Sequence, residues 1–136
     1  MELKFQFEYR GESHFGKIYR PYAKVSLKSL HENLWIDEWM IVDTGADFTT
    51  LPRYLSSALG VKIENDCIVG STSGVGGRQT IYILKEKVDI KVGSFSRKVP
   101  IAFFDNNQVP SLMGRLGFID TFNLEFLKSL EVVFNG

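Results

Sequence analysis

Alternation of apolar and polar residues at a period of two is the feature that most constrains how this chain can fold. Near the start, four apolar residues alternate with charged and polar ones: Leu3, Phe5, Phe7 and Tyr9. A second alternating run spans 22–28, and a third spans 34–42 and becomes wholly apolar at its end. Because successive side chains of a strand face opposite sides, this pattern predicts half-buried strands, the third of which enters the core.

One segment has a helical pattern instead. Pro52 comes early in it and Gly60 ends it, with Thr49 or Thr50 available as a cap. Proline near the first turn and glycine just past the last are typical of a helix. We therefore expect a short helix of about two turns over 52–59.

A glycine-rich stretch at 70–77 lies between two apolar runs, 67–69 and 80–83. Apolar runs around a glycine-rich tip predict a long hairpin over 67–83. Further alternation continues to Val92, followed by a turn and a return over 95–104. A last hairpin is expected from 123–126 and 131–134.

These elements predict a mainly β chain, folded as a small barrel or sandwich. The 136 residues suffice for one domain, 1–136, which would bury roughly 68% of its surface on folding. The first 21 residues precede the second strand and form an N-terminal extension of that domain.

The composition excludes several kinds of site and partner. With two histidines and one cysteine (Cys67), the chain lacks the residues for a Cys₄ or Cys₂His₂ zinc site, and we expect no metal and no cofactor. The net charge of 0 argues against a nucleic-acid partner. Without a long apolar segment or a signal-peptide pattern at the start, the sequence predicts no membrane association and a cytoplasmic location.

The run Ile-Val-Asp-Thr-Gly-Ala-Asp at 41–47 is the best candidate for chemistry. Asp43 follows an apolar strand directly, so it lies at the rim of the core, and Gly45 permits a turn whose N–H groups approach the carboxylate. An ordinary Asx turn would have the same residues, and Asp-Thr-Gly arises by chance in about 2 of 100 chains of this length. The tripeptide alone leaves both interpretations open.

The wider pattern resembles the retropepsins, the retroviral-type aspartic proteases. The run at 41–47 resembles their active-site strand, the hairpin at 67–83 stands where they carry a flap, and 109–115 resembles their apolar-Gly-Arg signature. The resemblance covers residues 22–134. It implies a closed β-barrel of the acid-protease type with one or two short helices, and an aspartic endopeptidase acting on peptide or protein substrates.

The resemblance also implies roles for individual residues. Asp43 would be the catalytic aspartate, Thr44 would interlock with its counterpart across a dimer, and Gly45 would face the substrate. Substrate contacts would come from Ala46, Asp47, Gly74, Val75, Gly76, Gly77, Pro110 and Leu112. Gly114 and Arg115 would be structural, with Arg115 forming an ion pair with Asp47.

The chain also departs from the viral pattern. Phe48 stands where an Asp or Ser is common, and Leu116 stands where an Asp or Asn is common. The N-terminal extension and the helix expected over 52–59 are additional features. These differences resemble a cellular member of the family.

Aspartic peptidase chemistry needs two carboxylates around one water, and this chain has one Asp-Thr-Gly. The second would come from another copy, in a homodimer with Asp43 at the twofold axis. Two carboxylates about 3 Å apart repel by roughly 5 kcal/mol, or about 4 pK units, so the pair would hold one proton near neutral pH. The alternative is a catalytically silent member that binds peptides or dimerises without turnover.

Overall fold

The computed structural model describes residues 2–74 and 76–136, and these residues form a mainly β structure. Nine of the described strands belong to one sheet: Tyr22–Lys28 (β4), Trp35–Val42 (β5), Thr49–Pro52 (β6), Cys67–Gly74 (β7), Gly77–Leu84 (β8), Val88–Val92 (β9), Phe95–Val99 (β10), Ile101–Phe104 (β11) and Leu112–Met113 (β12). Their order in the sheet is β10-β9-β4-β5-β12-β6-β11-β8-β7. The alternation at 22–28 and 34–42 is thus confirmed as β4 and β5.

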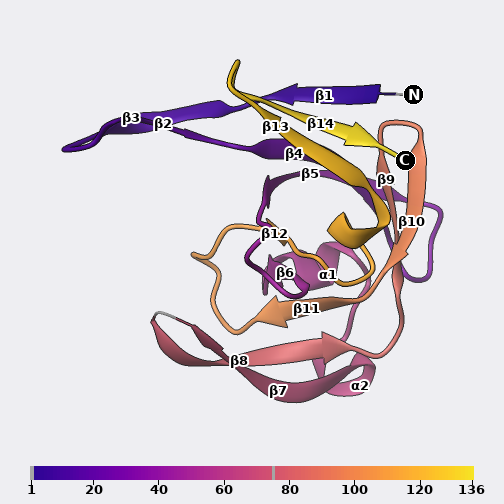
Figure 1. The fold of residues 1–136 in the computed structure, drawn as a ribbon. Coiled ribbons are helices and arrows are strands. Elements are labelled where there is room, and N and C mark those ends of the chain that lie inside the picture. The colour runs from indigo at the N-terminus through magenta and orange to yellow at the C-terminus, as the bar shows by residue number, and fades with distance from the viewer. Residues whose placement is uncertain (1, 75) are drawn as a thin grey trace.

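The expectation of a closed barrel is wrong. Figure 1 shows the sheet curling around the centre of the molecule as a half-barrel, with β7 and β10 at its two ends. Closure requires the first and last strands of a sheet to pair. Here β7 belongs to the hairpin that reaches away from the body, and β10 pairs with β9 on the opposite side.

A second sheet is formed by the ends of the chain. It contains Glu2–Gln6 (β1), Asn123–Leu127 (β13) and Glu131–Asn135 (β14), in the order β1-β14-β13. The hairpin expected near the end is therefore confirmed. Phe134 is fully buried and stacks edge-on against Phe5 and Phe122, so this sheet packs onto the core.

The long run that begins at Leu3 forms two strands instead of one. The chain leaves β1 and continues into Glu8–Ser13 (β2), which pairs only with Gly16–Arg20 (β3) among the described strands. Figure 1 shows this two-stranded hairpin projecting away from the rest of the molecule.

The helix expected over 52–59 is much shorter than predicted. Helix α1 spans Leu55–Ala58, a second helix α2 spans Ile63–Asp66, and a 3-10 turn η1 spans Ile119–Thr121. Thr49 and Thr50 cap nothing, because both are buried in β6, where strand pairing outweighs their value as caps. No helix in the described part of the chain is long and apolar enough to span a bilayer.

Strand β12 is the element that positions the candidate site. It lies between β5 and β6, parallel to β5 (Met113 opposite Val42) and antiparallel to β6 (Leu112 opposite Thr50). Residues 112–116 are therefore held directly beside the end of β5, although some 70 residues separate them in the sequence.

Candidate active site

Asp43 begins the turn that follows β5, and backbone hydrogen bonds fix its position. Its N–H donates to the carbonyl oxygen of Met113 (3.0 Å), and its own carbonyl accepts the N–H of Ala46 (3.1 Å). The N–H of Gly45 donates to the Asp43 carboxylate at Oδ1 (3.0 Å). The carboxylate is half-buried at the rim of the core, as the sequence predicts, and Thr44 and Gly45 are exposed.

The loop at 43–48 is held by the segment that follows β12. Arg115 and Leu116 donate their N–H groups to the carbonyl oxygens of Ala46 (2.9 Å) and Asp47 (2.8 Å). Nearby, the N–H of Gly114 donates to the buried hydroxyl of Thr49 (3.1 Å). These bonds make the loop at 43–48 and the segment at 113–116 one hydrogen-bonded unit.

Glycine is required at position 114 because two backbone segments meet there. A Cβ atom on Gly114 would lie 2.2 Å from both the carbonyl carbon and the carbonyl oxygen of Phe48. Real Cβ atoms do not approach backbone so closely, so any side chain would push the two segments apart. The close approach of the two segments thus explains why the Gly-Arg signature contains a glycine.

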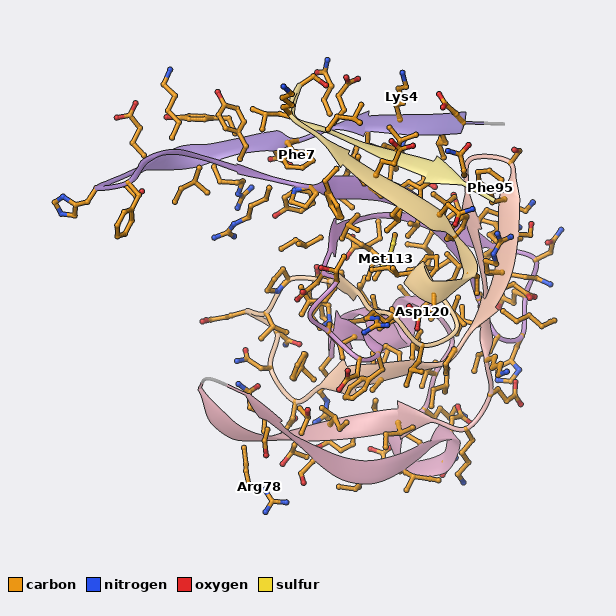
Figure 2. All side chains as sticks on the ribbon, viewed as in Figure 1. Lys4, Phe7, Arg78, Phe95, Met113 and Asp120 are labelled. Carbon is orange, nitrogen blue, oxygen red and sulfur yellow. The ribbon has the colours of Figure 1, made fainter. Side chains whose placement is uncertain are left out.

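The arginine of that signature does not pair as expected. Among the described ion pairs, Arg115 contacts Asp120 (Nε to Oδ1, 3.1 Å) and not Asp47. Asp120 belongs to the short helical turn η1, and Figure 2 labels it beside that turn. Arg115 therefore joins the segment at 113–116 to η1, while backbone bonds connect it to the loop at 43–48.

A cleft separates the loop at 43–48 from the glycine-rich hairpin. It consists of two adjoining cavities of about 150 and 310 Å³, both lined by Ala46 and Leu112. Gly45 and Asp47 line the first cavity, and Gly74, Gly76 and Gly77 line the second. Pro110 is exposed and lines neither cavity, and Val75 lies outside the described residues.

The cleft also contains residues that sequence reasoning missed. The walls include Phe48, Thr50, Thr72, Ser73, Gln79 and Phe104. Thr50 is buried, and its hydroxyl is a buried side-chain oxygen without a hydrogen-bond partner among the described residues. Thr72 and Ser73 could have been found, because they belong to the glycine-rich hairpin, whereas nothing local marks Phe104.

The hairpin itself is a regular antiparallel ladder. Pairing of β7 with β8 runs from Cys67 opposite Leu84 to Gly74 opposite Gly77, which confirms the hairpin expected over 67–83. Figure 2 shows the labelled Arg78 pointing away from the body; its guanidinium donates to Ser71 Oγ on the neighbouring strand (2.8 Å).

Near the base of the hairpin, an exposed ion pair connects three elements. Arg53 Nη1 lies 2.6 Å from Asp105 Oδ1 and 3.3 Å from the hydroxyl of Tyr82. The hydrogen bond to Asp105 raises the pKa of Arg53 above its already high ordinary value. Among residues 2–74 and 76–136, no group of three or more His, Cys, Asp or Glu side chains is placed to hold a metal.

Comparisons with known proteins agree with this geometry. The chain is similar over 98% of its length to 98% of the crystal structure of a retropepsin-like aspartic protease from Rickettsia conorii, with a TM-score of 0.62 and 15% identity. A comparison with curated protein sequences finds no match. A family model described as aspartyl protease matches residues 36–116, more than half of the chain. That match includes the Asp43 turn, the glycine-rich hairpin and the Gly114-Arg115 segment, and the chain therefore belongs to the aspartyl protease family, with a retropepsin-like fold.

Proposed function

We propose that this protein is a homodimeric aspartic endopeptidase with one Asp43 contributed by each chain. The observation that carries the proposal is the half-buried Asp43 carboxylate, held by a braced turn next to the cleft below the glycine-rich hairpin. A braced carboxylate next to a cleft is a suitable arrangement for acid–base chemistry on a bound chain.

The need for a second copy follows from the number of motifs. The sequence contains Asp-Thr-Gly once, and peptide hydrolysis of this type uses two carboxylates. Thr44 and Gly45 are exposed immediately beside Asp43, so the turn can approach its counterpart in a second chain. A twofold axis beside Asp43 would bring the two carboxylates together.

In such a dyad, repulsion keeps one proton on the pair near neutral pH. The ionised carboxylate takes a proton from water as the water oxygen attacks the scissile carbonyl carbon. The protonated carboxyl donates its proton to the carbonyl oxygen. When the tetrahedral intermediate collapses, the C–N bond breaks and the leaving amine takes the proton that the first carboxyl received from water. A hydroxyl of the intermediate returns its proton to the other carboxylate, so the pair again holds one proton. The Gly45 N–H helps to hold the Asp43 carboxylate in place for both steps.

An extended substrate would lie in the cleft. Ala46, Asp47 and Leu112 would contact it from one side, and the hairpin residues Gly74 and Gly76 from the other. An extended chain can add to the exposed edges of strands, which provides affinity without strong sequence demands. In this proposal Pro110, which is exposed and lines neither cavity, would contact the substrate outside the two cavities.

The test is Asp43→Asn, assayed on mixed peptides from pH 3 to 7 with Asp89→Asn as a matched control on the surface. We expect Asp43→Asn to lose cleavage with its melting temperature and mass in solution unchanged, and Asp89→Asn to keep cleavage. The wild-type rate should follow a bell-shaped curve with pH. Cleavage by purified Asp43→Asn protein would refute the proposal, and peptide binding without any wild-type turnover would favour the silent alternative.

A further inference from the structure

The hairpin of β2 and β3, here called the arm (residues 8–20), has no role in the site described above. It forms a sheet of its own, and in the described part of the chain neither strand is hydrogen-bonded to another sheet. An isolated two-stranded hairpin is only marginally stable in water, and a third strand or a packing surface is normally needed. The arm therefore needs a further strand or packing surface, which the described part of the single chain does not supply.

The base of the arm is firmly attached to the body. The N–H of Phe7, which Figure 2 labels where the arm leaves the body, donates to the carbonyl oxygen of Leu130 (2.8 Å). The Phe7 ring also packs edge-on against Phe126, with centroids 6.2 Å apart. Further out, the Arg10 guanidinium lies over the ring of Tyr22 at 5.7 Å. These contacts fix the direction of the arm.

That direction is set by β5, the strand that ends just before Asp43. Tyr22 in β4 pairs with Ile41 in β5, and the next bond along is from the Val42 N–H to the carbonyl oxygen of Pro21 (2.8 Å). Arg20 and the residues before it therefore lie beyond the end of β5, on the side where Asp43 emerges. Figure 1 shows the arm continuing the line of β4 out of the body. At about 3.3 Å per residue, the five residues of β3 extend roughly 17 Å past that point.

The arm exposes three aromatic side chains that a second surface could cover. Phe15 at its tip is fully exposed, and Tyr9 and Tyr19, which pack against each other across the strands, are 50% and 38% exposed. The charges of the arm are mixed in sign, Glu8 and Glu12 against Arg10, Lys17 and Arg20, so only a small net positive charge would repel an identical surface.

The area is suited to a dimer. At roughly 200 Å² for a ring, the exposed parts of these three aromatic side chains amount to about 400 Å² on each arm. Two arms and the partner surfaces they cover would then bury about 1,600 Å², the size of a standard specific interface.

We infer that the arm is a dimerisation element that crosses the twofold axis and packs on a second copy of this chain. The inference rests on the proposed function, because that function places the axis beside Asp43. An arm that continues about 17 Å beyond the strand end at Asp43 must then lie mostly on the partner's side. The same operation brings the partner's arm back over the first chain, so each contact occurs twice.

The test measures the dissociation constant of the dimer by analytical ultracentrifugation, in both wild-type and Asp43→Asn protein. Phe15→Glu is the cleanest variant, because the fully exposed side chain makes no ring contact described within its own chain. The double variant Phe15→Glu/Tyr19→Glu is the stronger one. Leu34→Glu is the matched control, because Leu34 is 55% exposed next to Trp35, at the end of β5 far from Asp43.

We expect Phe15→Glu to raise the dissociation constant at least ~10-fold and the double variant ~100-fold or more, since buried aromatic anchors dominate interfaces. Leu34→Glu should leave the constant unchanged. Amide hydrogen exchange should show residues 8–20 protected in the dimer and unprotected after dilution to monomer.

The outcomes separate the two proposals. A dimer unaffected by both arm variants, in a wild-type protein that cleaves peptides, overturns the role of the arm and leaves the protease intact. Dissociation by the arm variants in a wild-type protein without turnover supports the arm and refutes the enzyme. A protein that stays monomeric with its arm intact overturns the inference about the arm.

Discussion

The loop at 43–48 and the glycine-rich hairpin face each other across the cleft, but they are held in different ways. The loop donates and accepts backbone hydrogen bonds with a distant segment, at Asp43, Ala46 and Asp47. Beyond Thr80, toward the tip, the described residues of β8 pair only with β7. Strand β7 is itself an edge strand of the sheet. The Asp43 turn is thus fixed by the tertiary structure, whereas the hairpin above it can open locally at low cost.

The largest effect on stability should come from Gly114→Ala, which disrupts the contact between the loop at 43–48 and the segment at 113–116. Its Cβ would overlap the Phe48 backbone, and relief requires two segments to separate, so we expect a loss of about 3–5 kcal/mol in the free energy of unfolding. Urea denaturation would measure it. Gly74→Ala is the control, because a Cβ there meets nothing within 4 Å and the change should be small. Equal losses in the two variants would contradict the contrast between loop and hairpin.

Amide hydrogen exchange compares the two regions directly. The N–H groups of Asp43, Ala46 and Arg115 donate to backbone carbonyls of the braced unit, and we expect them to exchange at least ~100-fold more slowly than those of the hairpin tip at 71–74. Mass spectrometry or NMR on the same sample would show it. Similar protection in both regions would mean that the hairpin is as rigid as the loop.

Two neighbouring buried threonines differ in whether their hydroxyl groups are hydrogen-bonded to described residues, and so should differ in their contribution to stability. Thr49→Val removes the acceptor of the Gly114 N–H and should cost about 1–3 kcal/mol in the free energy of unfolding. Thr50→Val removes a buried hydroxyl without a partner among the described residues, and should leave stability unchanged or raise it by up to about 1 kcal/mol. Thermal melts of both variants provide the measurement, and a larger loss for Thr50→Val would contradict this assignment.

The smallest expected effect concerns thiol reactivity along the hairpin. Burial raises the pKa of the Cys67 thiol at the base of β7, with a further contribution from Asp66, so less thiolate is present at pH 8 than in an ordinary cysteine. In a Ser73→Cys variant, the exposed thiol should react with iodoacetamide about 10-fold faster than Cys67. Peptide mapping of the alkylated protein separates the two sites. Equal rates would mean that the base opens as readily as the tip.

Local sequence was a good guide wherever the burial of alternating side chains decides the structure. Val25 and Leu27 are buried and alternate with Lys24 and Ser26, and β4 forms as predicted. The glycine-rich hairpin, the last hairpin and the hydrogen bond from the Gly45 N–H to the Asp43 carboxylate were also predictable, because each depends on residues close together in the sequence.

Prediction failed where distant segments compete for the same backbone. Thr49–Pro52 look like the start of a helix, but β11 and β12 offer strand partners on both sides and bury all four residues. Asp47 looks like the partner of Arg115, but η1 brings Asp120 to the guanidinium instead.

The sequence by itself determined that this chain is mainly β, that an aspartate follows a buried strand in a tight turn, and that a glycine-rich hairpin exists. These features follow from side-chain periodicity and from backbone conformations within a few residues. The tertiary structure alone decided that the sheet stays open as a half-barrel, that β12 enters between β5 and β6, and that Thr50 lines the cleft. Each of these depends on hydrogen bonds and packing between residues far apart in the chain, whose free energies no local pattern contains.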